Sequence, residues 1–412
     1  MADLEGPRPG WPVSMDAGEL AEPIAAYAAH LNGLGYSALT IKGCTDSARH
    51  LGAWLARSHT AVAALDEHVL DRFARHRCRC GGNRASDRLS AKYVNRARRF
   101  ALFLGRLGLV TVTPSEAPVV DPSVARFGEW LCRHRGLSER TIVRHVRMVS
   151  RLLPALGADP HSYDAARVRA VILGESARCS AAYVKTMAMA LRGYLRFLAA
   201  RGECRPGLDH AVPPTPDWRL SALPRYLPPD DVARLIDGCD LSRPCGIRDR
   251  AILLLLARLG LRAHDVWAMA FDDVDWTTGM IRVHGKRRRE VRLPLPQEVG
   301  DALLAYIERA RPSVDEPKIF LRSAAPFAPF AGSNAVSTIV RFALRRAGIT
   351  DAPSQGAHLL RHSAATAMLR MGATLEAIGA VLRHESPNTT AHYAKIDVAT
   401  LRLIAQPWPE DA

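Results

Sequence analysis

The sequence predicts a mostly helical protein that ends in an α+β domain with a small antiparallel sheet. Apolar residues recur at three- and four-residue spacing through most of the chain, which is the pattern of amphipathic helices. The stretch around residues 280–294 has instead the pattern of a strand hairpin. Because a chain of 412 residues exceeds one ordinary hydrophobic core, two or three domains are expected.

The composition is that of a basic globular protein. Lys and Arg number 56 against 41 Asp and Glu, which gives a formal net charge of +15. Arg supplies most of the basic residues and binds phosphate through two parallel hydrogen bonds, so the expected partner is nucleic acid rather than a small acidic substrate. A basic surface without a specific partner stays open at this point.

No segment predicts insertion into a membrane. The longest apolar run, at residues 251–257, is far shorter than the ~20 residues that span a bilayer. Residues 1–20 are acidic and rich in Pro and Gly, without the basic start and apolar stretch of a secretion signal. The protein is therefore expected in the cytoplasm.

Eight cysteines are scattered without a repeated spacing, and in the cytoplasm they are expected to be reduced and buried. His76, Cys78 and Cys80 differ from the others, because a His with two nearby Cys could supply part of a zinc site. No second pair lies at the spacing of a zinc finger, and the two intervening arginines suit DNA phosphates equally well. No metal and no cofactor is predicted, and a metal at these three residues stays open.

Two proline-containing stretches, at residues 111–122 and 205–224, divide the chain, because proline resists both helices and central strands. The sequence accordingly predicts five parts. They are a flexible N-terminus at 1–20, an additional helical DNA-binding module at 21–112, a second helical module at 122–205, a linker at 206–223 and a C-terminal domain at 224–412.

The two helical modules resemble each other in sequence. Residues 27–41 resemble residues 127–142, and the Ser-Ala-x-Tyr-Val sequence that starts at Ser90 recurs at Ser180. A Phe-Leu pair follows in both modules. Each module is expected to contain four or five amphipathic helices, so a duplicated helical module is predicted, although unrelated helical bundles can mimic such a similarity.

Both modules also carry basic faces. Residues 57–106 include twelve Lys and Arg against four Asp and Glu. In the second module, Arg140, Arg144, Arg147 and Arg151 follow one another at helical spacing. A charged stripe is usually a solvated face, but two of them in similar modules of a basic protein favour contact with DNA.

The C-terminal domain is expected to combine helices with one hairpin. Pro228 and the acidic residues after it predict a helix start. Residues 280–284 and 289–294 predict two short strands. Further helices are expected over 357–371 and 374–382, and from Ser386, which would cap a helix that carries Tyr393 on its second turn. An α+β domain with a small sheet on a helical body follows.

Six residues of this domain have the chemistry that cleaves a phosphodiester without a metal. Such a reaction needs cations for the charge of the transition state, an acid for the leaving oxygen and an activated nucleophile. The candidates are Arg262, Lys286, His358, Arg361, His384 and Tyr393.

Local sequence suggests a role for the first two. Arg262 follows a helix that breaks at Gly260, and Asp265 could lock its orientation, although taken alone it would be a surface arginine. Lys286 follows Gly285 in the hairpin turn, where nearby arginines would lower its pKa toward that of a general acid. Any of the three arginines after Lys286 could instead bind the DNA backbone.

The remaining candidates lie near the end of the chain. His358 and Arg361 are three residues apart on one expected helix and share a face. His362 points about a third of a turn away and is expected to be packed or solvent-facing. His384 could donate to a phosphate oxygen, and Tyr393, alone among nine tyrosines beside such a histidine, would be the nucleophile.

The order of these residues resembles the tyrosine recombinase, or phage integrase, family. The pattern is Arg, Lys, His-x-x-Arg, His and then Tyr nine residues later. The flanking sequences agree, among them Gly-Leu-Arg with an acid three residues on, Leu-Leu-Arg-His-Ser-Ala-Ala-Thr and Thr-Thr-x-x-Tyr. The resemblance covers about residues 224–400. Each motif is weak alone, but six in order are specific.

The resemblance implies a site-specific DNA recombinase. Tyr393 would attack the scissile phosphate and form a 3′-phosphotyrosyl link, while Lys286 would protonate the leaving 5′ oxygen. The two arginines and His384 would stabilise charge, and His358 would assist proton transfer. No metal and no nucleotide would be consumed.

It also implies an architecture and partners. Residues 122–205 would be a SAM-like core-binding domain that closes over double-stranded DNA, and residues 224–412 the tyrosine recombinase catalytic domain. The segment at 394–404 would dock on a neighbouring protomer. A homo- or hetero-oligomer on DNA, a tetramer, is expected, with other recombinases of the same mobile element as further partners.

Two departures from the family pattern concern the role. Arg383 precedes His384 where many relatives have Gly, and the module at 21–112 exceeds the minimal plan. The additional module suits a transposon-type integrase that acts in DNA integration or transposition. The alternatives are a non-catalytic DNA-binding accessory protein, which the intact site argues against, and a type IB topoisomerase, which the two modules and the docking segment argue against.

Overall fold

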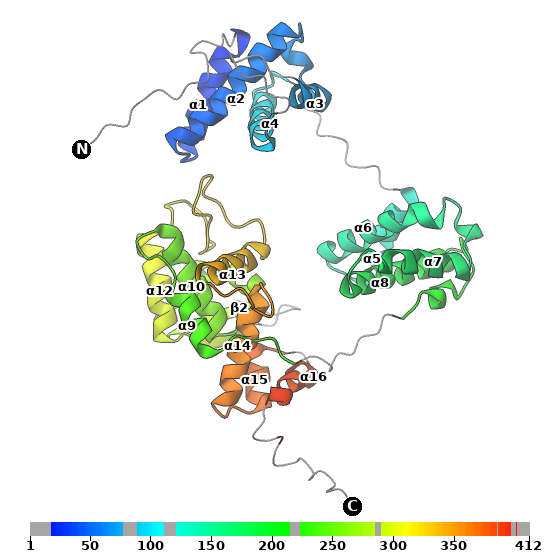
Figure 1. Cartoon of the computed structure of the whole chain (residues 1–412), viewed down its shortest axis with the longest axis vertical. Helices are drawn as coiled ribbons and strands as arrows, with labels where there is room; N and C mark the ends of the chain where they lie inside the picture. Colours follow the sequence, from blue (N-terminus) through cyan, green and yellow to red (C-terminus); the bar gives the residue numbers. More distant parts are fainter. Residues whose placement is uncertain are drawn as a thin grey trace, which may run out of the picture. The chain divides into compact units, whose positions relative to one another are not determined.

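The computed structural model describes residues 18–76, 89–110, 121–214, 223–284, 290–384, 386–396 and 401. Helices dominate this part of the chain (Figure 1), and its one sheet, between residues 274 and 294, has three antiparallel strands. The predicted fold class, mostly helical with a small antiparallel sheet, is confirmed. Among the described helices, none is long and apolar enough to cross a membrane.

Four helices form the first group. They are α1 (Ala21–Gly33), α2 (Ala38–Arg57), α3 (Glu67–Arg75) and α4 (Ala91–Arg106). Ser37 and Ser90 precede α2 and α4, and the hydroxyl of each accepts a hydrogen bond from a backbone N–H of the first turn. Tyr27 of α1 packs between Phe100 and Phe103 of α4, with ring centroids 5.3 and 5.1 Å away.

The first described residues fall within the predicted flexible N-terminus at 1–20. Residues 18–20 form a short 3₁₀ helix, and Leu20 is 2% exposed against the first helices. An apolar side chain buried in this way fixes the chain that carries it. Residues 1–17 lie outside the described part.

Four more helices form the second group, in the same order. They are α5 (Pro122–Arg135), α6 (Glu139–Leu156), α7 (Ala165–Ser176) and α8 (Ala181–Ala200). Ser138 and Ser180 precede α6 and α8 with the extended backbone that Ser37 and Ser90 also have, φ being −64° or −65° at all four. The helix starts thus agree with the sequence similarity. One core of buried residues between Val124 and Val212 holds this group together.

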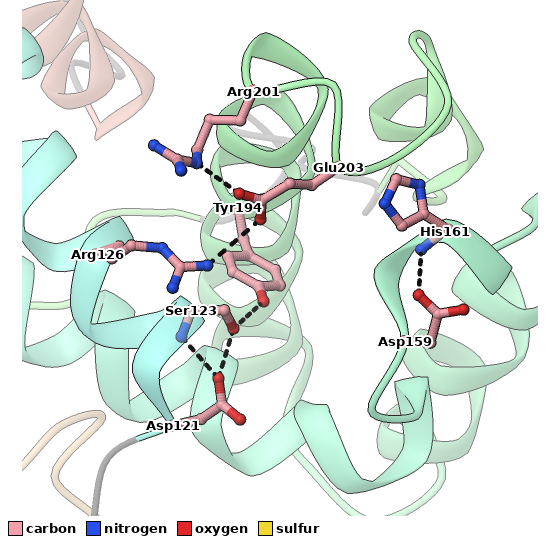
Figure 2. Close-up of polar contacts among 8 residues, drawn as sticks. All are labelled: Asp121, Ser123, Arg126, Asp159, His161, Tyr194, Arg201 and Glu203. Carbon is pink, nitrogen blue, oxygen red and sulfur yellow. Dashed lines mark hydrogen bonds and ion pairs between the residues drawn. The ribbon is translucent and has the colours of Figure 1, made fainter.

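Polar contacts join the start of α5 to α8 and the turn after it (Figure 2). The Ser123 hydroxyl lies 2.6 Å from the Tyr194 hydroxyl and also donates to Asp121, the N-cap of α5. Beyond the end of α8, Glu203 accepts from Arg126 at 3.5 Å and from Arg201 at 2.6 Å. These contacts hold the first residues of α5 in place, directly after the proline-containing segment.

The first residues of the predicted linker at 206–223 pack against the second group of helices. Residues 208–211 form a 3₁₀ helix, and Leu208 and Val212 are buried in the core of the second group. Arg192 of α8 donates to the carbonyl oxygens of Val212 and Pro213, and Arg196 pairs with Asp209 at 2.7 Å. The prolines do prevent an α-helix here, but a chain without one still packs when apolar side chains and carbonyl acceptors find partners.

The C-terminal part is built around one buried helix. Its helices are α9 (Pro229–Asp237), α10 (Pro244–Arg258), α11 (Ala263–Ala268), α12 (Gln297–Arg309), α13 (Asn334–Arg346), α14 (Ala357–Arg370), α15 (Leu375–Leu382) and α16 (Pro387–Thr390). The apolar run noted in the sequence is the middle of α10, where residues 251–256 are all 0% exposed. Helices α9, α12 and α14 pack against α10 (Figure 1), so the run serves as a core helix.

The sheet contains the predicted hairpin and one additional strand. Strand β2 (Met280–His284) pairs antiparallel with β3 (Glu290–Pro294), with Val283 opposite Val291. Strand β1 (Val274–Asp275) adds to the other edge of β2. Two residues are too few to show an alternating pattern, which explains why the sequence did not predict β1.

Candidate active site

Arg361 is a buried arginine of α14 that donates to two loops. It is 4% exposed, and its Nη1 donates to the carbonyl oxygen of Gly260 at 2.5 Å while Nη2 donates to that of Leu382. Burial, with the charges of Arg262 and Arg383, lowers the pKa of Arg361 to about 10. The guanidinium is therefore charged at neutral pH and fixed in direction.

Gly260 allows the first of these loops to approach. Its φ is +58°, a left-handed conformation that turns the chain after the end of α10. A Cβ at this position would lie 2.5 Å from a methyl carbon of Leu382. The sequence prediction of a helix break at Gly260 is therefore confirmed. Arg262 follows at once as the N-cap of α11.

Arg262 is held from both its backbone and its side chain. Asp265 accepts a hydrogen bond from the Arg262 backbone N–H at 2.8 Å, and Arg262 Nη2 donates to the carbonyl oxygen of Arg383 at 2.8 Å. Asp265 therefore holds the backbone of Arg262, whereas the sequence led us to expect that it orients the guanidinium. The side chain of Asp265 forms its ion pair with another arginine, Arg383, at 2.5 Å.

Arg383 has an unusual backbone. It adopts the left-handed conformation, with φ 56° and ψ 50°, directly after α15, and its side chain is only 6% exposed. A non-glycine residue in this conformation costs about 1 kcal/mol. The carbonyl of Arg383 binds Arg262 and its guanidinium binds Asp265, so the turn before His384 and the start of α11 hold each other.

His384 lies parallel to the ring of Tyr393. The two planes differ by 3°, with centroids 6.5 Å apart, and His384 Nδ1 lies 2.7 Å from the hydroxyl of Thr390 at the end of α16. Burial, with the charges of Arg361 and Arg262, lowers the pKa of His384 to about 4. The imidazole is therefore neutral at pH 7, and Thr390 fixes its orientation.

Tyr393 is buried in a 3₁₀ helix, η7 (Ala391–Ile396), that directly follows α16. The sequence predicts one helix from Ser386 through Tyr393, whereas the α-helical part ends at Thr390 and tightens into the 3₁₀ turn. Tyr393 is 2% exposed, and burial raises the pKa of its phenol to about 12, against the lowering effect of Arg361.

His362 contacts the Tyr393 hydroxyl. His362 Nδ1 lies 2.6 Å from Tyr393 Oη, and burial with the charge of neighbouring groups lowers the His362 pKa to about 4. His362 is half-buried, in agreement with the expectation of a packed residue, and its ring also contacts the Tyr393 hydroxyl, which the sequence did not predict. Its spacing was a usable signal, because His358 and His362 are four residues apart on α14 and their rings lie 6.3 Å apart.

His358 stands at the start of α14 beside the same cations. Much of the residue is exposed, yet desolvation of its ring, followed by the charges of Arg361 and Arg262, lowers its pKa. It is on the same face as Arg361, as predicted. The structure thus brings together five of the six predicted residues and adds His362.

The sixth predicted residue, Lys286, lies outside the described residues, as do Cys78 and Cys80. The flanking strands β2 and β3 form the hairpin that the sequence predicted. Within the described ranges, no three His, Cys, Asp or Glu side chains gather closely enough to hold a metal ion.

The basic stripe of the second helical group lies on α6. Arg140, Arg144 and Arg147 are exposed and have no acidic partner in the described part of the chain. Arg151 differs, because it pairs with Glu175 of α7 at 2.8 Å and lies over the ring of Tyr183 at 5.7 Å. Three of the four predicted arginines thus stand free in solvent.

Comparison with known proteins gives consistent matches. The model of the phage integrase family matches residues 225–399. The chain is 40% identical over 297 residues to "Putative integrase/recombinase y4rA" of Sinorhizobium fredii, covering 71% of this chain and 72% of that protein. It is 30% identical to tyrosine recombinase XerD of Listeria monocytogenes over 67% of this chain and 94% of the relative.

A solved structure shows the same fold. The recombinase XerH bound to its palindromic difH substrate, in a post-cleavage complex, superposes with a TM-score of 0.56 at 16% identity. The match covers 71% of this chain and 99% of XerH.

Proposed function

The chain belongs to the phage integrase family and is a tyrosine-type site-specific DNA recombinase, and from this premise we propose that Tyr393 is the nucleophile of strand cleavage. One observation supports this assignment. The Tyr393 phenol lies where α14, the loop after α15 and η7 meet, with His362 on its oxygen and His384 along its ring. The phenol oxygen attacks phosphorus, and the P–O5′ bond breaks to leave a 3′-phosphotyrosyl link.

The cations around Tyr393 stabilise the charge of the transition state. Arg361 and Arg262 already point at carbonyl oxygens, so phosphate oxygens that replace or join these acceptors meet donors that need little reorganisation. His384 adds a neutral N–H donor, with its orientation fixed through Thr390. Lys286 supplies the proton of the 5′ hydroxyl, and His358 assists proton transfer.

The substrate is double-stranded DNA. Residues 122–205 act as the core-binding domain, and the exposed arginines of its helix α6 contact DNA phosphates. Residues 21–112 bind a further part of the DNA. XerH, a relative in fold, is bound to its difH site. The active form is a homo- or hetero-oligomer, a tetramer, on DNA in the cytoplasm.

The biological role we propose is integration or transposition of a mobile element, with other recombinases of that element as partners. The 40% identity to y4rA, named as an integrase/recombinase, supports an integrase role. DNA beside the gene tests this role, because inverted repeats and adjacent recombinase genes are expected there.

The chemistry is tested with a suicide duplex that is nicked close to the recombination site. Wild-type protein is expected to accumulate a covalent adduct that survives denaturing electrophoresis, and Tyr393→Phe is expected to form none. Tyr226→Phe is the matched control, since Tyr226 belongs to the same domain but its hydroxyl binds Arg370. An adduct with Tyr393→Phe would refute the assignment.

A further inference from the structure

One hydrogen bond at the candidate site has no place in the roles above. His362 Nδ1 lies 2.6 Å from Tyr393 Oη, and the rings of the two residues are 5.7 Å apart. No other imidazole in the described part of the chain is within hydrogen-bond distance of this oxygen. The Nδ1 of His384 is occupied by Thr390, and the ring of His358 contacts that of His362.

The direction of this hydrogen bond follows from the charge states. The pKa of Tyr393 is raised to about 12 and that of His362 is lowered to about 4, both mainly by burial, so the resting pair is a neutral phenol and a neutral imidazole. His362 Nε2 has no partner among the described residues and can carry the ring proton. Nδ1 is then the acceptor, and the phenol donates.

We propose that His362 is a catalytic residue, the base that accepts the proton of Tyr393 as its oxygen attacks the phosphate. The inference rests on the proposed role of Tyr393 as nucleophile. In the step, the O–P bond forms, the O–H bond breaks and its proton moves to Nδ1, which leaves an imidazolium with Nε2–H. The P–O5′ bond breaks and the 5′ oxygen takes its proton from the separate acid.

A weak base suits this step. Because burial raises the pKa of Tyr393 to about 12, its phenol keeps the proton at rest. Once the oxygen bonds to phosphorus it becomes far more acidic, and transfer to a neighbouring imidazole turns favourable late in the step. The proton then sits beside Arg361, so the imidazolium returns it readily to Tyr393 when the strand is rejoined.

The test compares His362→Phe and His362→Asn on two suicide duplexes. One has the natural 5′ oxygen at the scissile phosphate, and the other has sulfur, which leaves as a thiolate and needs no acid. His362→Phe is expected to form adduct about 100-fold more slowly on both duplexes. Lys286→Ala is expected to be slow on oxygen and restored on sulfur, because only the leaving group depends on an acid.

Conservative variants keep the test decisive if His362→Phe fails to fold. Asn can place its carbonyl oxygen near the position of Nδ1, whereas Gln extends beyond it, so His362→Asn is expected to be faster than His362→Gln. His392→Phe is the matched control, since His392 lies edge-on to the Tyr393 ring at 6.1 Å. It is expected to cleave at nearly the wild-type rate.

Two outcomes overturn the inference. One is a His362→Phe rate within twofold of wild type, and the other is a defect that disappears on the sulfur duplex, which would place His362 on the leaving group. Both are distinct from failure of the proposed function, in which Tyr393→Phe would still form the adduct.

Discussion

Arginines of α6 and arginines of the candidate active site contrast sharply. Arg144 and Arg147 stand exposed and without acidic partners in the described residues, whereas Arg361 is 4% exposed and donates to two carbonyl oxygens. An exposed arginine keeps its hydration shell and its side-chain freedom. It therefore attracts the phosphates of DNA of any sequence, and salt screens this attraction. A buried arginine has lost both before DNA arrives, and its direction is already set. We therefore propose that exposed arginines bind DNA phosphates in one region and that buried arginines act in strand cleavage in the other.

The largest effect is expected from replacing the buried arginine Arg361. Arg361→Ala should lower the rate of adduct formation by about 10³. It should also reduce the free energy of unfolding by about 1–3 kcal/mol, because the carbonyls of Gly260 and Leu382 lose their donor. Suicide-duplex kinetics and urea unfolding measure the two. Arg370→Ala, on the exposed end of the same helix, is the control, and a folded Arg361→Ala within tenfold of wild type would contradict the contrast.

Replacing the exposed arginines of α6 should weaken DNA binding and leave the rate of strand cleavage unchanged. The triple variant of Arg140, Arg144 and Arg147 to Ser should bind DNA about 10- to 100-fold more weakly at physiological salt, and the slope of log affinity against log salt should fall by about 2–3. At saturating DNA the cleavage rate should be unchanged. Arg133→Ser on α5 is a one-charge control, because Arg133 is near Glu129. An unchanged salt slope would show that α6 does not face DNA.

Acid is expected to destabilise the buried site. The pKa values of His362 and His384 are lowered to about 4 in the folded protein. The unfolded chain therefore binds these protons first, and stability falls as pH drops from about 6.5 toward 4. From pH 7 to pH 5 the expected loss is about 1–2 kcal/mol per imidazole, measured by urea unfolding.

A variant of His362 shows whether this residue causes the loss of stability in acid. His362→Gln should lose less stability between pH 7 and pH 5 than wild type does, whereas His68→Gln, at an exposed position on α3, should behave like wild type. Equal acid sensitivity of all three proteins would show that His362 does not cause it.

The smallest expected effect concerns the left-handed turn at Arg383. Arg383→Ala loses the ion pair with Asp265 and keeps the strained backbone, whereas Arg383→Gly loses the pair but relieves the strain. The Gly variant should be more stable than the Ala variant by about 1 kcal/mol in urea unfolding. Equal stabilities would mean that the backbone strain is not felt.

Long periodic segments and ordered motifs were predictable from the sequence. The helix expected over 357–371 is α14 at 357–370, and the strand at 280–284 is β2 with the same bounds. Five of the six predicted site residues are described, and they gather at one place. Helical spacing along α14 accounts for His358 and Arg361, which lie three residues apart on it.

Contacts that depend on tertiary packing were not predictable. His362 meets Tyr393, which is 31 residues further along, and nothing local to α14 shows that η7 will lie against it. Arg151 fits the α6 stripe by spacing, but Glu175 on another helix engages it. The packing of residues 208–213, within the predicted linker, was not predictable for a similar reason. Prolines indicate the absence of a helix but carry no information on burial.

In the proposed contact of α6 with DNA, the Arg151–Glu175 pair limits the length of strand that α6 can reach. From Arg140 to Arg147 the helix rises about 10 Å, the axial reach of about three phosphates along one strand. A free Arg151 would lengthen this reach to about 16 Å, or about five phosphates. Because Glu175 engages Arg151, the Glu175→Gln variant is expected to free Arg151 and to extend the strand protected from nuclease by one or two nucleotides.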